Sequence, residues 1–278
     1  MTLLLELSDM REGYVTLVDT IAHLGKEVSP RGQAVLEVTD VTFTVADLTN
    51  ALPIGVGRDL NLLIAALEAL QLVGATSCPE LLVAASPQFA NYQEGDGRFY
   101  GAYGERVGFQ TESVVEKLRR DRDTRQAVIT LWDPRLDNVP GFRDYPCTVA
   151  LGFRVRRDRL DLSVLMRSND VWLGTAYDVF QFTQLQWTVA RQLGVEPGRY
   201  THTAWSLHIY ERDLPRVAKL HAPQGELPRL PRGLGDDAER VAVELLADPA
   251  SFGQTEDPDI SWYQEQVLRA LARVSSER

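Results

Sequence analysis

The sequence predicts a mixed α/β (α+β) fold, because apolar alternation typical of strands is interspersed with apolar residues at helical spacing. Strand patterns occupy residues 34–45, 127–132, 147–166 and 198–212. The clearest helical patterns occupy residues 57–73 and 174–194. We therefore expect a mixed sheet flanked by helices.

Length and composition predict one large domain. The 278 residues show no sharp change in composition, so we expect residues 1–278 to form a single domain with 216–278 as a helical C-terminal extension. The chain is 44% hydrophobic and 24% charged and has no apolar run long enough to cross a bilayer. The first residues lack the basic start of a secretory signal. We expect a cytoplasmic protein.

Net charge and cysteine content argue against several classes of protein. The net charge of −10 argues against a general nucleic-acid surface, so an anionic ligand requires a local cluster of arginines. The two cysteines, Cys78 and Cys147, are too few for a disulfide framework and have no metal-ligand spacing to a histidine. We expect no metal, no nucleic-acid partner and no membrane partner.

In the N-terminal half, Asp9 can cap a helix that ends at Gly25. A turn at residues 30–32 precedes one or two strands from Ala34 to Val45. Residues 57–73 form an amphipathic helix that Gly74 closes. A charged helix from Thr111 to about Arg122 leads to the strand 127–132.

In the C-terminal half, Cys147 and every second residue to Val155 share one buried strand face. Residues 156–159 make a hairpin turn, and residues 160–166 form the returning strand. A long buried helix runs from Gly174 to Gly194, and a strand at 198–212 carries His208 and Tyr210 on one face. Two further helices are expected at 236–247 and 259–273.

The densest polar segment runs from Met166 to Asp170 and on through Gly174 to Asp178. Such a run is often a solvated loop, but two other segments strengthen a functional interpretation. They are Tyr145-Pro146-Cys147-Thr148 and Ser206-Leu207-His208-Ile209-Tyr210. In order and spacing the three resemble the thymidylate synthase superfamily, whose pattern is Pro-Cys, Arg-Ser-x-Asp with Gly and Asn after it, and His-x-Tyr. The resemblance covers roughly residues 30–215 and is strongest from Arg125 to Tyr210.

Three departures point to one branch of that superfamily. The chain has Asp178 in place of Asn, Thr148 in place of the His after the cysteine, and Trp205-Ser206 in place of Gly-Asp. These residues resemble the cytidylate (CMP or dCMP) hydroxymethylases. The resemblance implies a sheet packed at a homodimer interface.

The resemblance also implies how a pyrimidine nucleoside monophosphate is held. Arg167 and Ser168, with Arg31 and an Arg125 donated by the partner subunit, would bind the phosphate. Gln126 replaces the second arginine usual in the family, and Arg120 or Arg122 could supply the missing contact. The sugar hydroxyl falls to His208 and Tyr210, and Asp170 supports the loop backbone. Arg31 could equally be a solvated turn residue.

For the co-substrate, the resemblance implies 5,10-methylenetetrahydrofolate, contacted by Glu68, Tyr103, Asp170 and Gly174. The paired tryptophans that pack on folate are absent, and Phe89 and Tyr92 are the aromatic candidates to replace them. Glu68 also matches the catalytic glutamate of the family, which organises water and proton transfer around the base. Its alternative role is a boundary residue that faces water.

Cys147 is the expected nucleophile. Carbon 5 of a pyrimidine is a poor nucleophile, and a thiolate added at carbon 6 makes it able to attack a one-carbon iminium. We expect the neighbouring arginines to lower the thiol pKa. At Asp178, a carboxyl group accepts from N4 of cytosine and, when it shares a proton, donates to N3. The alternative for Asp178 is a helix N-terminal charge.

These residues predict a cytidylate 5-hydroxymethyltransferase, a transferase that hydrates the one-carbon adduct to 5-hydroxymethyl-CMP. One alternative is a thymidylate synthase or another pyrimidine C5 methylase. A second is a catalytically inactive nucleotide-binding dimer. The small Ala176 favours CMP over dCMP and nucleoside-antibiotic biosynthesis, although the residues leave ribose and deoxyribose open.

Overall fold

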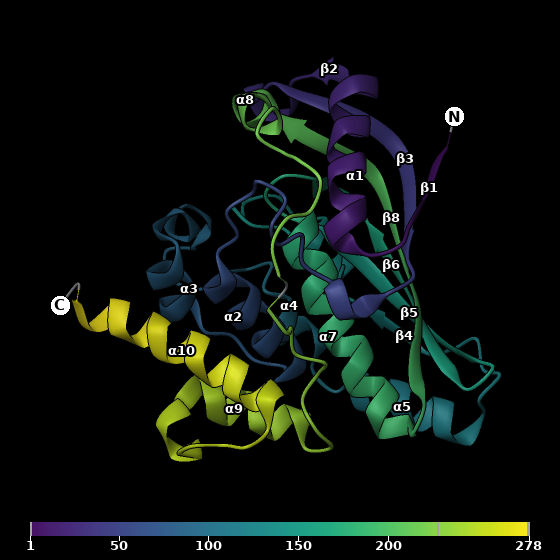
Figure 1. Cartoon of the computed structure of the whole chain (residues 1–278), viewed down its shortest axis with the longest axis vertical. Coiled ribbons are helices and arrows are strands. Elements are labelled where there is room, and N and C mark those ends of the chain that lie inside the picture. The colour runs from purple at the N-terminus through teal and green to yellow at the C-terminus, as the bar shows by residue number, and fades with distance from the viewer. Residues whose placement is uncertain (1, 227, 277–278) are drawn as a thin grey trace.

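A mixed sheet forms the centre of the computed structural model, which describes residues 2–226 and 228–276. The main strand order is β1-β3-β8-β6-β5-β4, with β2 beside β3 and β7 beside β8 (Figure 1). β1 pairs with β3, and β6 with β8, in parallel, while β3 pairs with β8, and β5 with β6, in antiparallel. The strands are β1 (Leu3–Leu7), β2 (Lys26–Val28), β3 (Val35–Val45), β4 (Val128–Thr130), β5 (Thr148–Arg156), β6 (Arg159–Met166), β7 (Asn169–Asp170) and β8 (Glu196–Tyr210).

Helices cover one side of this sheet in two layers. α1 and α7 lie against the sheet, and α2, α3, α9 and α10 lie beyond α7 (Figure 1). The predicted mixed sheet flanked by helices is therefore confirmed. The helices are α1 (Met10–Leu24), α2 (Leu62–Val73), α3 (Pro79–Ala85), α4 (Tyr103–Val107), α5 (Gln110–Arg120), α6 (Pro134–Asp137), α7 (Thr175–Leu193), α8 (Leu214–Val217), α9 (Ala238–Ala247) and α10 (Pro258–Ser276).

Most predicted elements occur within a few residues of their expected ends. Asp9 caps α1 by accepting a hydrogen bond from the Glu12 amide, and Gly25 follows its last turn. α7 ends at Gly194 in the left-handed conformation. The β5–β6 turn places Arg157 and Asp158 at φ values of 53° and 55°, as a tight hairpin requires.

Two predicted boundaries were wrong. The helix expected from residue 57 begins at Leu62, because the Asn61 side chain accepts from the Leu63 amide and so caps it there. Strand β5 begins at Thr148 rather than Cys147, and the pairing register shifts between Thr148 and Ala150. That irregularity breaks the alternation, so Cys147 does not share a strand face with Leu151.

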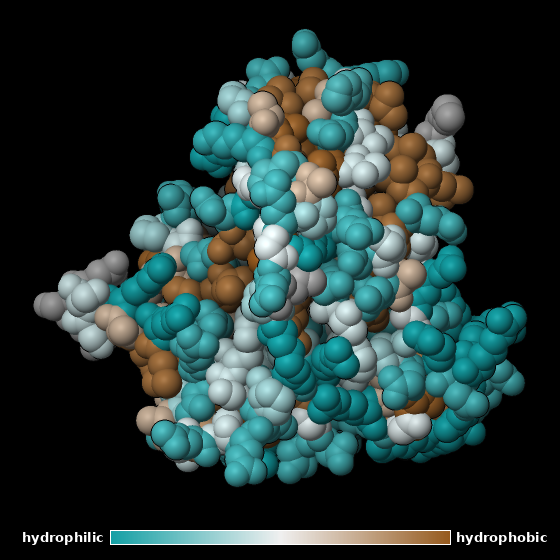
Figure 2. Space-filling model, in the orientation of Figure 1, coloured by the Kyte–Doolittle hydropathy of each residue, from teal (hydrophilic) through white to brown (hydrophobic). Residues whose placement is uncertain are grey.

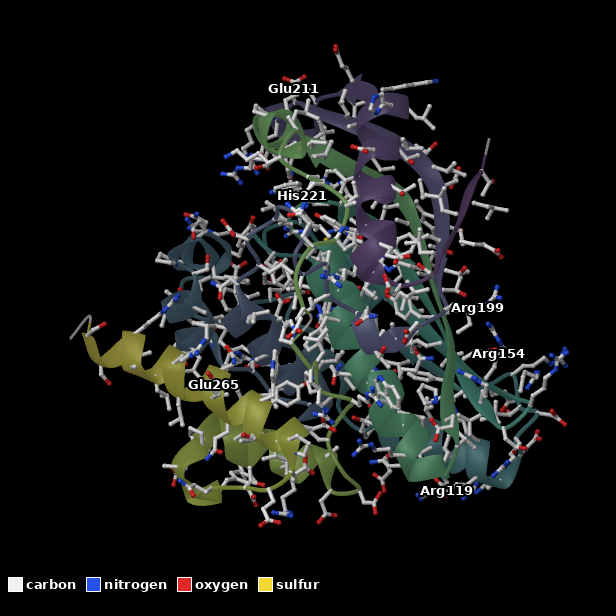
Figure 3. All side chains as sticks on the ribbon, viewed as in Figure 1. Arg119, Arg154, Arg199, Glu211, His221 and Glu265 are labelled. Atoms are coloured by element: carbon white, nitrogen blue, oxygen red, sulfur yellow. The ribbon has the colours of Figure 1, made fainter. Side chains whose placement is uncertain are left out.

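No helix of residues 2–226 and 228–276 covers the opposite face of the sheet (Figure 1). Arg154 and Arg199 extend from the sheet on the side away from α7 (Figure 3). Thr42 and Thr203 hydrogen-bond at 3.0 Å between β3 and β8, and Trp205 is 50% exposed. Hydrophobic residues also gather along the edge where β1 lies, where Leu4 is exposed (Figure 2).

The C-terminal helices α9 and α10 pack against α2, and α10 also packs against α3. Together these helices enclose a second hydrophobic cluster beside the one that the sheet forms with α1 and α7. None of the helices in the described ranges is long and apolar enough to span a membrane.

Candidate active site

The hairpin β5–β6 brings Cys147 and Arg167 together. Thr148 pairs with Met166, and the Arg167 amide donates to the Cys147 carbonyl at 2.9 Å. The Arg167 side chain donates to the carbonyls of Pro146 at 2.9 Å and Tyr145 at 3.1 Å. Its Nη2 lies 3.9 Å from Cys147 Sγ. The backbone therefore fixes a guanidinium beside the thiol.

The predicted effect of arginine on the thiol pKa was wrong in its net direction. Burial raises the pKa of Cys147 to about 11, and the positive charges of Arg167 and Arg31 only partly oppose that effect. Desolvation of the thiolate outweighs the attraction of the guanidinium groups. Cys147 therefore rests as a thiol with a cation already in place.

Asp178 lies in the first turn of α7 and is only 8% exposed. Its Oδ2 accepts from Asn169 Nδ2 at 2.7 Å, and its Oδ1 accepts from Gln181 Nε2 at 3.1 Å. Burial raises the pKa of Asp178 to about 7, although both donors favour the ionised form. A carboxyl group with such a pKa can donate or accept a proton near neutral pH.

Glu68 is the second acid of this region. It lies on α2, which packs against α7, and it is half-buried. Burial raises the pKa of Glu68 to about 8, and the charge of Asp178 raises it further. Glu68 and Asp178 therefore form a pair of weak acids that share one environment.

Asp170 anchors the loop between β7 and α7. Its Oδ1 accepts from the amides of Trp172 at 2.8 Å and Leu173 at 3.0 Å. Its Oδ2 is buried and has no hydrogen-bond partner among the described residues. Gly174 closes the loop, and a Cβ there would lie 3.1 Å from Asp178 Oδ2. The loop thus presents one free carboxyl oxygen, and a Cβ at Gly174 would be a tight fit against its neighbours.

His208 pairs with Asp170 in the β7–β8 register and lies edge-on to Tyr210, with ring centroids 5.4 Å apart. Burial lowers the pKa of His208, and the carboxyl groups of Asp170 and Glu37 oppose that effect. The Arg212 guanidinium lies 4.0 Å from the Tyr210 ring centre. His208 and Tyr210 therefore join the same cluster as Asp170.

The other residues predicted to bind phosphate differ from one another in exposure and in location. Arg31 is exposed and left-handed, with φ of 53°, and its charge lowers the pKa of both Cys147 and His208. Ser168 is half-buried beside Arg167. Arg125 is exposed in the loop between α5 and β4, and no contact with the cysteine cluster occurs in the described chain. Arg120 and Arg122 pair instead with Glu116 and Asp158.

Three aromatic residues were expected near the co-substrate, and the structure shows their surroundings within the chain. The Tyr103 hydroxyl accepts from the Thr148 amide at 3.2 Å, and its ring stacks on Phe182. Phe89 packs edge-on against Phe99 in the second hydrophobic cluster, whereas Tyr92 is 50% exposed. Tyr103 thus supports the strand that follows the cysteine.

Sequence reasoning missed Asn169, Gln181, His202 and Trp132. The first two bind Asp178, His202 lies behind Asn169, and Trp132 lies 5.5 Å from the Arg167 guanidinium. Polar residues at core-facing positions of α7 and β8 are the signal that could have revealed Gln181 and His202.

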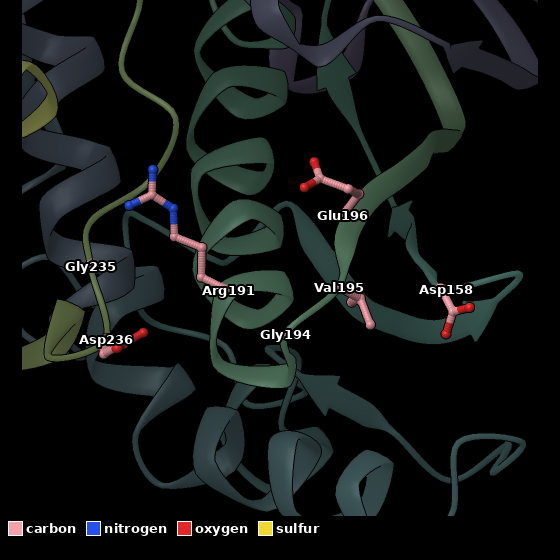
Figure 4. A pocket seen from close by; sticks show the side chains of 7 residues that line it. All are labelled: Asp158, Arg191, Gly194, Val195, Glu196, Gly235 and Asp236. Atoms are coloured by element: carbon pink, nitrogen blue, oxygen red, sulfur yellow. The ribbon is translucent and has the colours of Figure 1, made fainter.

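The described ranges contain no cluster of three or more His, Cys, Asp or Glu side chains suited to a metal ion. A shallow hollow of about 630 Å³ lies at the far end of α7, around Arg191 and Gly194 (Figure 4). It is remote from the first turn of α7, where Asp178 lies. The chemistry is therefore concentrated around the cysteine, the arginine and two weak acids.

The site places a cysteine thiol beside an arginine guanidinium, with two weak acids in the same region. The thymidylate synthase family model matches residues 12–239. The chain belongs to the thymidylate synthase family.

Two relatives are phage proteins named deoxyuridylate hydroxymethyltransferase. The one from Bacillus phage SP01 is 32% identical over 72% of this chain, and the one from Pseudomonas phage M6 is 30% identical over 76%. This chain spans only 57% and 60% of their lengths. A putative thymidylate synthase from Methanothermobacter marburgensis is 28% identical over 74% of this chain and 92% of its own length.

Proposed function

We propose that this protein is a pyrimidine nucleotide 5-hydroxymethyltransferase with a cytidylate as its substrate. The observation that carries the proposal is the buried Asp178 carboxyl group, whose pKa of about 7 lets it hold a proton at neutral pH. Family membership and the hydroxymethyltransferase names of two relatives support the one-carbon chemistry.

In this proposal, Arg167, Ser168 and Arg31 hold the phosphate and Cys147 attacks carbon 6. Arg167, 3.9 Å from the sulfur, stabilises the thiolate as it forms. The thiol proton passes to bound water as the bond to carbon 6 forms. Carbon 5 then bonds to the one-carbon unit of 5,10-methylenetetrahydrofolate, and loss of the carbon-5 proton to water beside Glu68 with departure of tetrahydrofolate leaves an exocyclic methylene. Water adds to the exocyclic methylene, and expulsion of the thiolate from carbon 6 releases the hydroxymethylated nucleotide.

Base choice rests on Asp178. With its proton, the carboxyl group donates to N3 of cytosine and accepts from N4, which matches both polar groups of that edge. A mismatched buried hydrogen bond costs about 1–3 kcal/mol, enough for roughly tenfold discrimination or more. Glu68, with its pKa near 8, exchanges protons with bound water around the base.

Uridylate hydroxymethylation is the second candidate, because the two phage relatives are named for deoxyuridylate. A carboxyl group whose proton lies on the oxygen that faces position 4 would instead donate to O4 of uracil and accept from N3–H. The oxygen that holds the proton therefore decides which base is matched. The tritium-release experiment below distinguishes the two candidates.

The co-substrate contacts are proposed at Asp170, whose buried Oδ2 lacks a partner, and at Gly174, Tyr103 and Glu68 nearby. Ala176 is fully buried as the second residue of α7, two residues before Asp178. We retain CMP as the preferred substrate over dCMP.

Tritium release from carbon 5 tests the base. We expect release from CMP or dCMP in the presence of methylenetetrahydrofolate, and at least about tenfold less from UMP and dUMP. Asp178→Asn should lower kcat/KM for the cytidine nucleotide by about tenfold or more, since the amide presents a donor to N4. A preference of the wild type for dUMP would replace the cytidylate proposal with the second candidate.

A further inference from the structure

The Asp178 carboxyl group is held by two amide donors that are themselves buried. Asn169 is 3% exposed and Gln181 is 4% exposed. Each donates to a different oxygen of the carboxyl group, at 2.7 Å and 3.1 Å respectively. A turned Asn169 amide would place an oxygen against a carboxylate oxygen, so the orientation of that amide controls the charge that Asp178 can carry.

Contacts behind Asn169 fix that orientation. Its Oδ1 accepts from the Thr175 hydroxyl at 2.6 Å and lies 3.1 Å from His202 Nε2. The other ring nitrogen of His202 lies 2.9 Å from the Tyr200 hydroxyl. Burial lowers the pKa of His202 to about 3, so the ring is neutral and carries one proton.

The protonation states of Tyr200 and His202 decide which group donates in each of these hydrogen bonds. Burial raises the pKa of Tyr200 far above neutrality, so its hydroxyl keeps a proton and can donate to His202 Nδ1. His202 Nε2–H then donates to Asn169, and Asn169 donates to Asp178. The His202 ring also stacks on Phe43, with centroids 4.7 Å apart. Asn169 is thus locked as a donor toward Asp178.

We propose that Asn169, locked by Thr175 and His202, is a positioning residue: with Gln181 it makes each Asp178 oxygen accept a hydrogen bond from the protein, and it thereby directs the carboxyl proton toward the bound base. The amide N–H groups of Asn169 and Gln181 each occupy one lone pair of a different carboxyl oxygen. A proton on Asp178 therefore has to take a lone pair that faces away from these two amides. Only the link from that proton to the base rests on the proposed function.

The surroundings of Asp178 leave these amides as the groups that favour its ionised form. The titratable groups that act on Asp178 or respond to its charge are acids, a thiol and phenols, and none of them is cationic in the described part of the chain. They are Glu68 on α2, Asp170 on β7, Cys147 before β5, Tyr103 on α4 and Tyr200 on β8. Loss of the Asn169 donor should therefore raise the pKa of Asp178.

The test is a carbon-13 NMR titration of the full chain with carboxyl-labelled aspartate, in which Asp178→Asn assigns the Asp178 signal. Asn169→Leu removes the donor and should raise the pKa of Asp178 by about one unit or more. Thr175→Val removes one of the hydrogen bonds that orient the Asn169 amide, so it should raise the pKa of Asp178 by a smaller amount. Thr183→Val is the matched control, because Thr183 is equally buried on α7 but donates to the Phe180 carbonyl.

An unchanged Asp178 pKa in folded Thr175→Val and Asn169→Leu proteins would overturn the proposal, as would an equal shift in Thr183→Val. If Asn169→Leu does not fold, Thr175→Val alone decides.

With cytidine nucleotide, the alkaline fall of kcat/KM should move up in pH together with the NMR titration. A shifted titration with an unmoved pH profile would refute the role of the proton at the base. Absence of any turnover would refute the proposed function and leave the NMR result valid.

Discussion

At Cys147, burial and charge act in opposite directions on one thiol. Burial raises its pKa to about 11, while the Arg167 guanidinium favours the thiolate. At neutral pH the sulfur is therefore a thiol, and in the proposed mechanism the thiolate develops only as the bond to carbon 6 forms. The guanidinium is held by backbone carbonyls, so it needs no rearrangement when that charge appears.

Cys147→Ser should abolish turnover and leave nucleotide binding nearly intact, because the sulfur acts on the reacting carbon alone. Steady-state kinetics and calorimetric titration of the nucleotide measure the two effects separately. Retention of more than about a tenth of the wild-type kcat would contradict the assignment of the nucleophile.

Glu68 should reduce stability at alkaline pH. Its pKa is raised from an ordinary value of 4.5 to about 8, so the folded state favours its neutral form. The stabilisation is complete below the lower value and is lost as the pH rises through the upper one. Glu68→Gln should therefore raise Tm by a few degrees near about pH 9 and change it little near about pH 4. A similar Tm gain at both pH values would argue against ionisation as the cause.

The sequence predicted the groups that can react, but not the groups that orient them. Cys147, Arg167, Asp178 and His208 lie in short motifs of unusual residue types, so the pattern alone marks them. Asn169 lies within such a motif, but nothing in the sequence distinguishes it there. His202 lies six residues before His208 on the same strand, where it pairs with Val164 of β6 and not with β7. Their roles depend on which strands become neighbours, and that is decided by the packing of the whole sheet.

At the scale of elements, periodicity predicted the helices and strands but not their irregular ends. The apolar stripe of α2 extends to Leu60, yet the cap at Asn61 starts the helix later. The register shift in β5 has no sequence signal, although it decides where Cys147 lies. Local hydrogen bonds, rather than hydrophobic pattern, set both features.

Helix α10 is anchored by Asp259, which is 3% exposed. Its carboxyl group pairs with Arg229 at 2.7 Å and Arg191 at 3.1 Å, and accepts from the Arg232 amide at 3.1 Å. The segment before α9 is thereby tied to both α7 and α10. The position of the C-terminal helices therefore depends on one buried carboxylate.

Asp259→Ala should lower the free energy of unfolding by about 1–3 kcal/mol, because a partly buried amide and two guanidinium groups lose their acceptor. Urea unfolding measures this. Glu265→Ala on the same helix is the control, since Glu265 forms an exposed pair with Arg269 (Figure 3) and should change little. Equal losses in the two variants would show that Asp259 is not a special anchor.

At the scale of the whole molecule, the uncovered sheet face is the proposed homodimer interface. Half-buried threonines and the exposed Trp205 lie on the side away from α7, where no element of the described chain covers them. Arg125 is exposed in the loop between α5 and β4. Both features are consistent with an arginine that completes the phosphate site of the partner.

Arg125→Ala should weaken nucleotide binding, and mixing it with Cys147→Ser should restore part of the activity. In a hybrid dimer, the subunit that keeps Cys147 receives an intact Arg125 from its partner, so one of the two sites is complete. Activity is measured after subunit exchange has been verified. Exchange without recovery would indicate a site built from one chain.

Mass spectrometry of the product tests the central claim most directly. The enzyme is incubated with methylenetetrahydrofolate and, in separate reactions, CMP, dCMP, UMP and dUMP. Addition of one formaldehyde unit to CMP, and less to dCMP, is the predicted result, with both uridine nucleotides nearly unchanged. A product that carries a methyl group would identify a synthase, and hydroxymethylation of dUMP alone would contradict the role of Asp178 as a reader of cytosine.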